Sequence, residues 1–508
     1  MATAPFDLTS PDSLYTPARM AAVDRQTIAD GTPGTVLMDR AGMAVAEAAR
    51  AWMTAPRRHR VVVLAGPGNN GGDGFVAARY LNAWGHAVTV GLLGARERLS
   101  GDAGWAAAHW PGPVLALESE ALARALSAAD LIIDALFGAG LSKPLTGVAA
   151  HAVDAANAQP AVRLAVDIPS GVDGATGAIR GTAFQAHQTV TFERAKPGHG
   201  LLPGAACVGR LDRRPIGLSD RALGLEAEPL AFNTAALWGR AGDADRPDLH
   251  KYHHGHAVIV GGAAPGLGAG RLAAQAALRA GAGLVTLAAA TETYAIQAAA
   301  LTEVMVAPIA GAQALDELLA DPRKNAVVYG PGAAADAATR ERTAQILRLG
   351  RASVLDAGAL TAFAGQPDGL RDAIAGPVVL TPHEGEFATL FGFPVNEFDT
   401  KVTAARHAAR AVGAVIVLKG PDTVIAGPDG AATIDFDPLP RLATAGTGDV
   451  LAGIIGGLLA RGWPAMAAAG LGVRLHRLAA YAAGHGLIAR DVIDRIAEAR
   501  GQWPGGPL

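Results

Sequence analysis

The sequence predicts an α/β protein made of two three-layer αβα domains, and three observations support that fold class. Short apolar runs of strand length alternate with Ala-rich stretches of helical length, which is typical of βαβ units around a parallel sheet. The alternation occurs twice, over roughly residues 60–210 and again from residue 256. Between the two lies a charged, proline-rich stretch without periodicity, residues 213–250. We therefore predict a first domain over residues 1–225 and a second over residues 226–508.

Composition narrows the class of protein. The chain has 508 residues, of which 50% are hydrophobic, so two sizeable cores are possible. The net charge of −3 favours neither nucleic acid nor an anionic membrane as a partner. Cys207 is the single cysteine, which excludes an internal disulfide. The N-terminus lacks a secretory pattern, and the apolar run 450–460 is too short to span a bilayer. We expect a soluble cytoplasmic protein, with a homo-oligomer left open.

The elements of the first domain follow in order. Residues 17–55 are predicted to be mainly helical, and FVAARYLNAW (75–84) is predicted as the helix after the first strand. The predicted strands are VVVLAG (61–66), AVTVGLL (87–93), LIIDALFG (131–138), RLAVDIPSG (163–171) and QTVTF (188–192). Parallel order is expected because helical stretches separate several of these strands.

A glycine-rich stretch, GPGNNGGDG (66–74), follows the first strand and matches the dinucleotide fingerprint G-x-G-x-x-G of a Rossmann-like domain. No acid ends the second strand to hold a ribose, which disfavours an NAD-dependent oxidoreductase. Asn69, Asn70 and Asp73 lie together at the start of the next helix. They either cap that helix or bind a ligand.

Polar residues also follow two other strands. Asp134 ends one strand, and Asp167, with Ser170 three residues later, ends the next. Ligands of open parallel sheets bind outside the carboxyl ends of the strands, so these side chains are expected to meet. Asn70, Asp134 and Ser170 supply an amide, a carboxylate and a hydroxyl. This ligand set of low charge suits a monovalent cation such as potassium.

The stretches GPGNNGGDG, DALFGAGL and DIPSGVDG, preceded by LMDRAG (37–42), resemble the epimerase domain of the NAD(P)H-hydrate repair enzymes over roughly residues 15–215. The resemblance implies that the dinucleotide is a substrate with a hydrated nicotinamide ring, NADH hydrate or NADPH hydrate. It implies potassium ligands at Asn70, Asp134 and Ser170. Asp167 is the candidate for proton transfer at the hydrated carbon. In an alternative assignment, Asp73 shares this role with Asp167 or takes it over. The implied substrate contacts are Asn69, Asn70, Gly71, Gly72, Asp73, Gly138, Ala139, Gly140, Leu141, Ser142, Lys143, Pro144 and Asp167.

In the second domain the predicted strands are HAVIVGG (256–262), GLVTLAA (283–289), NAVVYGPG (325–332), ASVLDAG (352–358), PVVLTPH (377–383), AVIVLKG (414–420) and DTVIAG (422–427). Long Ala- and Leu-rich helices are expected from residue 449 onward. The cluster HKYHHGH (250–256) contains His250, His253, His254 and His256, but no cysteine or carboxylate in metal-ligand spacing, so a zinc site is disfavoured.

The stretch ATAGTGDVLAGIIGGLLA (443–460) joins a Gly-rich turn to an apolar helix with Asp449 in its first turn. The backbone N–H groups of residues 445–448 and the helix dipole are expected to form an anion hole. A carboxylate beside an anion hole suits a base that takes a hydroxyl proton during phosphoryl transfer. The plainer alternative is an ordinary helix with an acidic first turn.

This stretch resembles the G-x-G-D signature of ribokinase-like αβα domains, and more closely their hydrate dehydratase branch. VLTPHEGEF (379–387), VLKGPDTVIAGPDG (417–430) and ALRAGAGLVTLA (277–288) resemble the same branch, over roughly residues 246–495. The implied hydrate contacts are Ala269, Gly332, His383 and Asp449, and the implied nucleotide contacts are Lys419, Gly420, Pro421, Asp422, Thr423 and Gly448.

The resemblance implies a chemistry for the chain. Asp449 activates the hydroxyl of the S hydrate, ADP (or ATP) donates a phosphoryl group, magnesium bridges the nucleotide phosphates, and loss of phosphate restores NAD(P)H, with AMP as the other product of ADP. The first domain interconverts the R and S epimers. The rival interpretations are a ribokinase-like small-molecule kinase with an accessory N-terminal domain, and a first domain that binds partners without catalysis.

Overall fold

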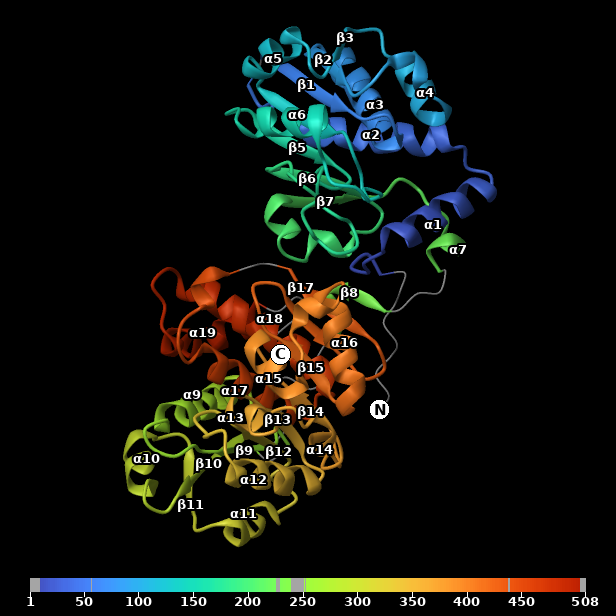
Figure 1. Cartoon of the computed structure of the whole chain (residues 1–508). Helices are drawn as coiled ribbons and strands as arrows, with labels where there is room; N and C mark the ends of the chain where they lie inside the picture. The colour runs from blue at the N-terminus through green and yellow to red at the C-terminus, as the bar shows by residue number, and fades with distance from the viewer. Residues whose placement is uncertain are drawn as a thin grey trace. The chain divides into compact units, whose positions relative to one another are not determined.

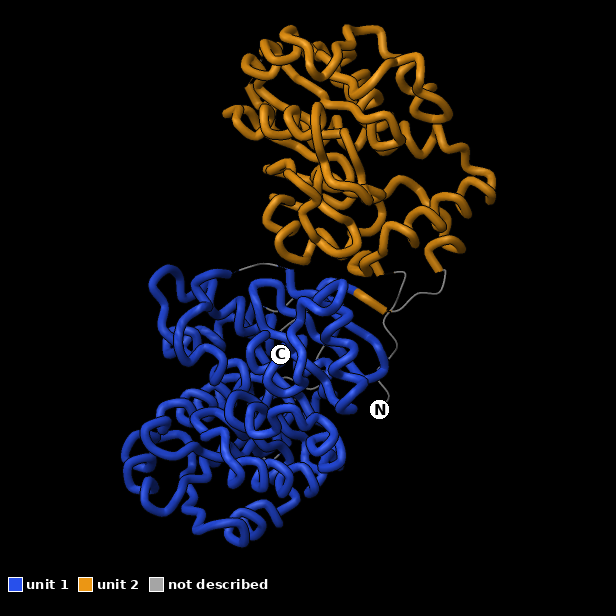
Figure 2. Tube along the Cα trace, viewed as in Figure 1, with its two compact units in different colours: residues 1–6, 231–508 blue, residues 7–230 orange. Residues whose placement is uncertain are grey.

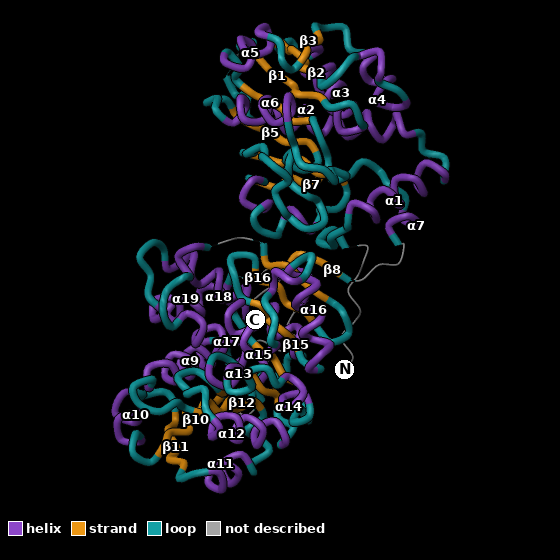
Figure 3. Tube along the Cα trace, viewed as in Figure 1, coloured by secondary structure: helices purple, strands orange, loops and turns teal. Residues whose placement is uncertain are grey.

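The computed structural model describes residues 10–55, 57–224, 229–238, 251, 253–436 and 439–502. The chain divides into two compact units, Asp7–Leu230 and Ala231–Leu508, the latter together with Met1–Phe6 (Figure 2). The boundary at 225/226 stays a prediction, because residues 225–228 lie outside the described ranges. The α/β fold class is confirmed, since each unit has a largely parallel sheet with helices packed on it (Figures 1 and 3).

The first unit contains a seven-stranded sheet in the order β3-β2-β1-β4-β5-β6-β7, with every paired neighbour parallel. Its strands are β1 (Arg60–Ala65), β2 (Ala87–Leu92), β3 (Val114–Ala116), β4 (Leu131–Ala135), β5 (Val162–Val166), β6 (Gln188–Phe192) and β7 (Arg210–Arg214). Its helices are α1 (Pro17–Ala29), α2 (Gly34–Arg50), α3 (Asn69–Ala83), α4 (Gly101–Ala108), α5 (Glu120–Ser127), α6 (Gly147–Asn157) and α7 (Asp220–Leu223). The strand order reverses at β1, and ligands of such sheets bind at this point.

Alternating side chains of β1 explain the three layers. Val61 and Val63 pack into a core with α2 and α3, whereas Val62 and Leu64 pack into the core of α5 and α6. Successive strand residues point to opposite faces, so a strand buried on both faces must be apolar throughout. This is why VVVLA is a continuous apolar run.

The second unit contains a ten-stranded sheet in the order β11-β10-β9-β12-β13-β14-β15-β16-β17-β8. The pairs from β11 to β15 are parallel, whereas β15–β16 and β16–β17 are antiparallel. The strands are β8 (Leu230–Phe232), β9 (His256–Val260), β10 (Leu284–Ala290), β11 (Met305–Ile309), β12 (Ala326–Tyr329), β13 (Ala352–Leu355), β14 (Val378–Leu380), β15 (Val415–Leu418), β16 (Thr423–Ala426) and β17 (Ala432–Asp435). The helices are α8 (Ala235–Trp238), α9 (Leu267–Arg279), α10 (Tyr294–Ala300), α11 (Ala312–Leu319), α12 (Ala337–Arg348), α13 (Gly358–Thr361), α14 (Pro367–Arg371), α15 (Glu384–Phe391), α16 (Lys401–Val412), α17 (Thr447–Ala460), α18 (Ala465–Ala483) and α19 (Ala489–Gly501).

Helix α17 lies inside the core of the second unit, which explains its apolar sequence. It is buried along nearly its whole length, as expected for a helix that is hydrophobic on all sides. Two glycines allow it to approach α9 closely. A Cβ on Gly453 would overlap the backbone of Ala273, and a Cβ on Gly457 would overlap that of Ala277.

Sequence analysis did not predict β3, β7, β8, β11 or β17. β3 is three residues long, and β7 is the charged edge strand RLDRR. Edge strands commonly carry charges, so they lack the apolar pattern by which strands are recognised. Within the described ranges, none of the helices combines the length and apolarity that crossing a bilayer requires.

Candidate functional site

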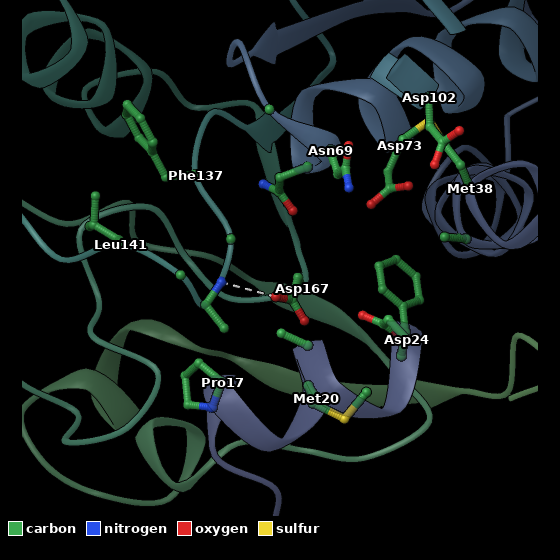
Figure 4. A pocket seen from close by; sticks show the side chains of 18 of the residues that line it. Pro17, Met20, Asp24, Met38, Asn69, Asp73, Asp102, Phe137, Leu141 and Asp167 are labelled. Atoms are coloured by element: carbon green, nitrogen blue, oxygen red, sulfur yellow. Dashed lines mark hydrogen bonds between the residues drawn. The ribbon is translucent and has the colours of Figure 1, made fainter. Parts of the chain in front are cut away.

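A cavity of about 680 Å³ lies at the carboxyl ends of β1, β4 and β5, with residues of α1 and α2 among its walls (Figure 4). Most of the residues predicted to contact substrate in the first domain line it. These are Asn69, Asn70, Asp73, Gly138, Ala139, Gly140, Leu141, Ser142, Lys143 and Asp167. The cavity also has lining residues that sequence analysis did not single out, including Asp24, Asp102 and Lys196.

The predicted loop 69–73 forms the first turn of α3. Gly68 is the N-cap residue of this helix and no side chain caps it, so the idea that Asn69 or Asp73 caps the helix is wrong. Gly71 and Gly72 are not among the lining residues. Gly71 packs against the backbone of Gly66, and Gly72 packs against Met38, at distances too short for a Cβ. These two glycines bring α3 close to its neighbours.

Asp134 and Ser170 meet directly at the edge of the sheet, as predicted. The Asp134 side chain accepts hydrogen bonds from the backbone N–H of Ser170 (2.7 Å), the Ser170 hydroxyl (2.7 Å) and the backbone N–H of Leu136 (3.2 Å). Burial raises the pKa of Asp134 to about 6, and the hydrogen bonds from Ser170 and Leu136 only partly offset that effect. The carboxyl group is therefore buried among neutral donors.

These groups fit a monovalent cation. The Ser170 hydroxyl is also linked to the backbone of Phe137, at the start of the loop that contains Gly138. Asn70 faces the same loop, with Oδ1 3.1 Å from the position that a Cβ on Gly138 would occupy. A cation here would offset the burial of the Asp134 carboxylate, and hard oxygen ligands suit potassium. Pro144, the last residue of the predicted loop, is not among the cavity-lining residues.

Asp167 follows β5 with a φ of 64°, a backbone conformation that non-glycine residues rarely adopt. Its carboxylate forms an ion pair with Lys196 and accepts hydrogen bonds from the backbone N–H of Ala139 (3.0 Å) and the hydroxyl of Thr191 (3.2 Å). Burial alone would raise the pKa of Asp167, but the Lys196 ammonium brings it below its ordinary value. Asp167 is therefore a fixed anion.

His199 supports the same segment from within the core. Its Nδ1 accepts a hydrogen bond from the backbone N–H of Lys196 (2.9 Å), so Nε2 carries the proton and donates to the carbonyl oxygen of Asp167 (2.8 Å). Burial lowers the pKa of His199 to about 4, so the ring is neutral at physiological pH. The backbones of Asp167 and Lys196 are thus joined through one imidazole.

The other carboxyl groups of the cavity behave in the opposite way. Burial, together with the charge of Asp167, raises the pKa of Asp73 well above its ordinary value. Burial also raises the pKa of Asp24 to about 6. Figure 4 shows that Asp24, Asp73 and Asp167 point into the same space. The cavity therefore combines carboxyl groups of raised pKa with one of lowered pKa, a combination that general acid–base chemistry uses.

In the second unit, Asp449 lies in the first turn of α17, where sequence analysis placed it. The helix begins after Gly446, whose φ of 85° gives the sharp turn that precedes the helix. Burial raises the pKa of Asp449 to about 6, and the charge of Asp356 adds to that effect while Lys419 opposes it. A base with such a pKa is largely ionised at neutral pH and still accepts a proton readily.

Lys419 joins a charged cluster at the start of α17. Its Nζ lies 2.8 Å from Asp356 Oδ1 and 3.6 Å from Glu386 Oε2, and 3.6 Å from the position that a Cβ on Gly448 would occupy. Burial alone would lower the pKa of Lys419, but Asp356 and Glu386 raise it above its ordinary value. The structure therefore brings Lys419 close to Gly448 and Asp449.

Asp356 and Glu386 are functional candidates that sequence analysis missed. Asp356 directly follows β13, in the run ASVLDAG, and Glu386 lies in the motif VLTPHEGEF. Asp356 Oδ1 also accepts a hydrogen bond from the Thr381 hydroxyl (2.8 Å). A carboxylate at a strand end was the signal used for Asp134 and Asp167, and the same signal applied to Asp356 would have found it.

Of the other predicted hydrate contacts, His383 adjoins Lys419, and Ala269 adjoins Gly332. His383 is the N-cap of α15, and its Nδ1 accepts hydrogen bonds from the backbone N–H groups of Gly385 (3.0 Å) and Glu386 (3.1 Å). The backbone of His383 pairs with that of Lys419. The Ala269 Cβ lies 3.3 Å from the position that a Cβ on Gly332 would occupy, so these two predicted contacts also adjoin.

The predicted nucleotide loop 419–423 is a tight turn between β15 and β16. The Thr423 hydroxyl donates to the carbonyl oxygen of Gly420 (2.8 Å), while Pro421 is exposed at the tip. The Asp422 carboxylate forms an ion pair with Lys401 of α16 (2.8 Å). Asp422 therefore anchors the loop to a helix.

Two other features of the sequence are the histidine cluster 250–256 and the single cysteine, Cys207. Among the described histidines of the 250–256 cluster, His256 lies 2.8 Å from the Thr286 hydroxyl, and burial lowers its pKa to about 4. His250 lies outside the described residues. Across the described ranges, no group of three or more His, Cys, Asp or Glu side chains is arranged to hold a metal ion. Burial raises the pKa of the Cys207 thiol above its ordinary value.

Comparison with known proteins accounts for both units. A family described as YjeF-related protein N-terminus matches residues 34–198, and a family described as NAD(P)H-hydrate dehydratase matches residues 257–496. A bifunctional NAD(P)H-hydrate repair enzyme of Moorella thermoacetica is 38% identical over 507 residues, 95% of each chain. The enzyme of the same description from Escherichia coli is 35% identical over 91% of this chain and 88% of its own. The solved structure of an ADP/ATP-dependent NAD(P)H-hydrate dehydratase from Bacillus subtilis, co-crystallised with ATP/Mg²⁺, is 28% identical and covers 54% of this chain and 98% of its own, with a TM-score of 0.48.

Proposed function

The chain belongs to the family of bifunctional NAD(P)H-hydrate repair enzymes, and we propose that its two units divide the repair of hydrated nicotinamide cofactors between them. The first unit interconverts the R and S hydrates of NADH and NADPH. The second dehydrates the S hydrate back to NAD(P)H at the expense of ADP, releasing AMP and phosphate. One observation carries this proposal: the match to bifunctional relatives extends over 95% of the chain, so both halves are present together.

In the first unit, the cavity residues hold the hydrated ring. Asp167 is kept as an anion by Lys196 and acts as the base, whereas Asp73 keeps its proton and acts as the acid. Environments that move two carboxyl pKa values apart support such a division of roles. The backbone and side chains of residues 138–143 supply the remaining contacts.

Asn70, Asp134 and Ser170 are the residues that would hold potassium. Bound there, the ion supplies a positive charge that offsets the buried Asp134 carboxylate. Ser170 is bonded to Phe137, next to the loop that lines the cavity, so a filled site would also hold that loop in place. The potassium site is therefore assigned a positioning role.

In the second unit, Asp449 accepts the proton of the substrate hydroxyl. The backbone N–H groups at the start of α17 stabilise the phosphoryl group, with Lys419 beside them. Residues 420–423 and Gly448 hold the adenine nucleotide, and Ala269, Gly332 and His383 face the hydrate. Magnesium bound to the nucleotide would neutralise phosphate charge. ADP is the proposed donor, with ATP as the alternative, and the reaction is assigned to the cytoplasm.

The test follows the absorbance of reduced nicotinamide when the purified protein receives both hydrate epimers, magnesium and ADP or ATP. Recovery from both epimers is expected. Asp449→Asn should abolish recovery, and Asp167→Ala should restrict rapid recovery to the S epimer. Asp154→Asn is the matched control, because Asp154 is an exposed residue of α6 outside the cavity lining. Absence of recovery with either nucleotide would contradict the proposal, and a stable phosphorylated product would favour the small-molecule kinase.

A further inference from the structure

The first-unit cavity has an unequal balance of charges. Its wall carries Asp24 from α1, Asp73 from α3 and Asp102 from α4, together with Asp167 after β5. The cationic groups are Lys196, which is 3% exposed, and Lys143 in the loop 138–143. The Lys196 ammonium is bound to Asp167 and to the Thr191 hydroxyl (2.9 Å), and its attraction for Asp24 does not offset the effect of burial on that group.

Asp24 is one of the other three carboxyl groups that line the cavity. The Asp24 side chain lies within electrostatic range of Asp167 and Lys196, and burial raises its pKa to about 6, so it is mostly ionised at neutral pH. Figure 4 shows its carboxyl group pointing toward Asp167 across the cavity. A half-buried carboxylate of this kind is destabilised by lost hydration and would be stabilised by a positive charge in the cavity.

A second observation is an unpaired polar atom in the cavity wall. The Asn70 Nδ2 atom is buried and has no hydrogen-bond partner in the described structure. Asn70 lines the same cavity. Buried polar groups are nearly always paired, so a bound molecule with an acceptor oxygen would complete this wall.

The chemistry of the substrate offers three routes to inversion. Hydration of a dihydronicotinamide ring places the hydroxyl on the carbon next to the ring nitrogen. That carbon can lose the hydroxyl as water and leave an iminium cation, it can separate from the nitrogen and become an aldehyde, or it can lose its own hydrogen and become a carbanion. Only the first route develops a positive charge on the ring.

We propose that the first unit inverts the hydrated carbon through a ring iminium cation, and that Asp24 is a further catalytic residue whose carboxylate stabilises this cation. This inference rests on the epimerase function proposed above. A carbanion would instead place negative charge beside the carboxylates of Asp24 and Asp167, which would destabilise it. The ring-opened aldehyde carries no charge that Asp24 would stabilise.

The step balances without a redox partner. The Asp73 carboxyl group gives its proton to the substrate hydroxyl, the carbon–oxygen bond breaks, and water leaves. The nitrogen lone pair forms the carbon–nitrogen double bond of the iminium. A second water attacks the opposite face of the carbon while its proton returns to Asp73, directly or through Asp167. The product is the other epimer, and its hydroxyl oxygen comes from solvent.

The experiment supplies the full-length protein with one hydrate epimer, without nucleotide, in oxygen-18-labelled water. Mass spectrometry measures the label in the inverted product, after subtraction of the spontaneous reaction. One solvent oxygen per inversion is expected, with no carbon-bound deuterium when the reaction is repeated in heavy water. Retention of the original oxygen, or deuterium at the inverted carbon, would overturn the iminium route. If the protein does not accelerate inversion at all, the proposed function fails instead, so the two failures are distinguishable.

Variants test the role of Asp24. Asp24→Asn keeps the shape but removes the charge, and it should slow inversion about 100-fold, comparable to the loss of one group that stabilises transition-state charge. Asp24→Glu should recover much of that rate. Dehydration of the pure S epimer by the second unit should remain unchanged in both variants, which confines the effect to the first unit, and Asp154→Asn is the exposed control. An Asp24→Asn protein with the native inversion rate would remove Asp24 from the catalytic residues.

Discussion

Lys419 and Asp356 form an ion pair of 2.8 Å at the foot of α17, beside Gly448 and Asp449. The two residues come from different strand ends, yet together they set the charge around the proposed base. Asp356 raises the pKa of Asp449 and Lys419 lowers it, so the pKa of Asp449 depends on both partners. A change to either residue should therefore shift the pKa of Asp449, and with it the pH dependence of dehydration.

Replacement of Asp356 should shift the acid limit of dehydration. Asp449 must be ionised to act as a base, and its pKa is about 6, so activity should fall as the pH falls through 6. Asp356→Asn removes a negative neighbour, so the pKa of Asp449 and the acid limb of kcat/KM should move down by about one pH unit. The pH profile of dehydration with pure S hydrate measures this shift. An unchanged acid limb of the pH profile would show that Asp356 does not influence the pKa of Asp449.

Loss of Lys196 should move epimerisation to higher pH. Without its ammonium partner, Asp167 loses the charge that most opposes the effect of burial, so its pKa rises and less of it is ionised at a given pH. Lys196→Met should therefore be slower in epimerisation at pH 7 and regain rate as the pH rises, whereas Lys196→Arg should keep the native profile. An epimerisation rate that is low at every pH would instead indicate a structural defect.

Potassium should stabilise the first unit. A ligand that binds only the folded state adds about 2.7 kcal/mol at a concentration 100 times its Kd. Calorimetry of the full chain in potassium chloride and in choline chloride at equal ionic strength should give a higher Tm in potassium for one transition. Asp134→Asn should remove the difference. Equal Tm values for the native protein in both salts would contradict the site.

His199 should make the first unit sensitive to acid. Its folded pKa of about 4 lies below the ordinary value of 6.5, so the unfolded chain takes up the proton first. Its contribution to stability is therefore complete above pH 6.5 and is lost as the pH falls from 6.5 toward 4. His199→Gln offers a donor and an acceptor without titrating, and its Tm should fall less over this pH range. Parallel Tm curves for the two proteins would argue against this role.

Position 453 should not tolerate even the single methyl group that Gly453→Ala adds. Alanine favours a helix over glycine by about 1 kcal/mol, but a Cβ here would overlap the backbone of Ala273. The overlap should dominate, and Gly453→Ala should destabilise the second unit by a net amount of about 1–3 kcal/mol. Gly501→Ala is the control, because nothing lies within 4 Å of its Cβ position. Thermal unfolding of the full chain compares the two, and a neutral Gly453→Ala would show that α17 shifts freely.

The sequence predicted best where apolar strands end in polar residues. Asp134, Ser170 and Asp167 were placed at one edge of a parallel sheet, and the structure brings Asp134 and Ser170 into direct contact. Asp449 was placed at the start of its helix because the Gly-rich turn before it is a local pattern. Local chemistry and strand topology are both readable from one sequence.

The missed residues depend on packing between distant segments. Asp24 reaches the cavity from α1, and Lys196 pairs with Asp167 across 29 positions of the chain. No spacing in the sequence marks either residue. Gly71 and Gly72 were predicted as substrate contacts from the family resemblance, and both pack against neighbouring segments. A motif identifies a turn, but it does not show which residues of the turn line the cavity and which pack against the rest of the protein. The substrate-contact assignments themselves stay predictions.

The glycine contacts between α17 and α9 have a consequence beyond stability. Gly457 lies ten residues beyond Thr447, a lever arm of about 15 Å along the helix axis. A side chain added where α17 contacts α9 would tilt α17. This tilt would displace the backbone N–H groups at the start of the helix. The position of the proposed phosphoryl-binding turn should thus depend on two glycines farther along the same helix, Gly453 and Gly457. Substitutions at these glycines should therefore weaken nucleotide affinity before they unfold the second unit.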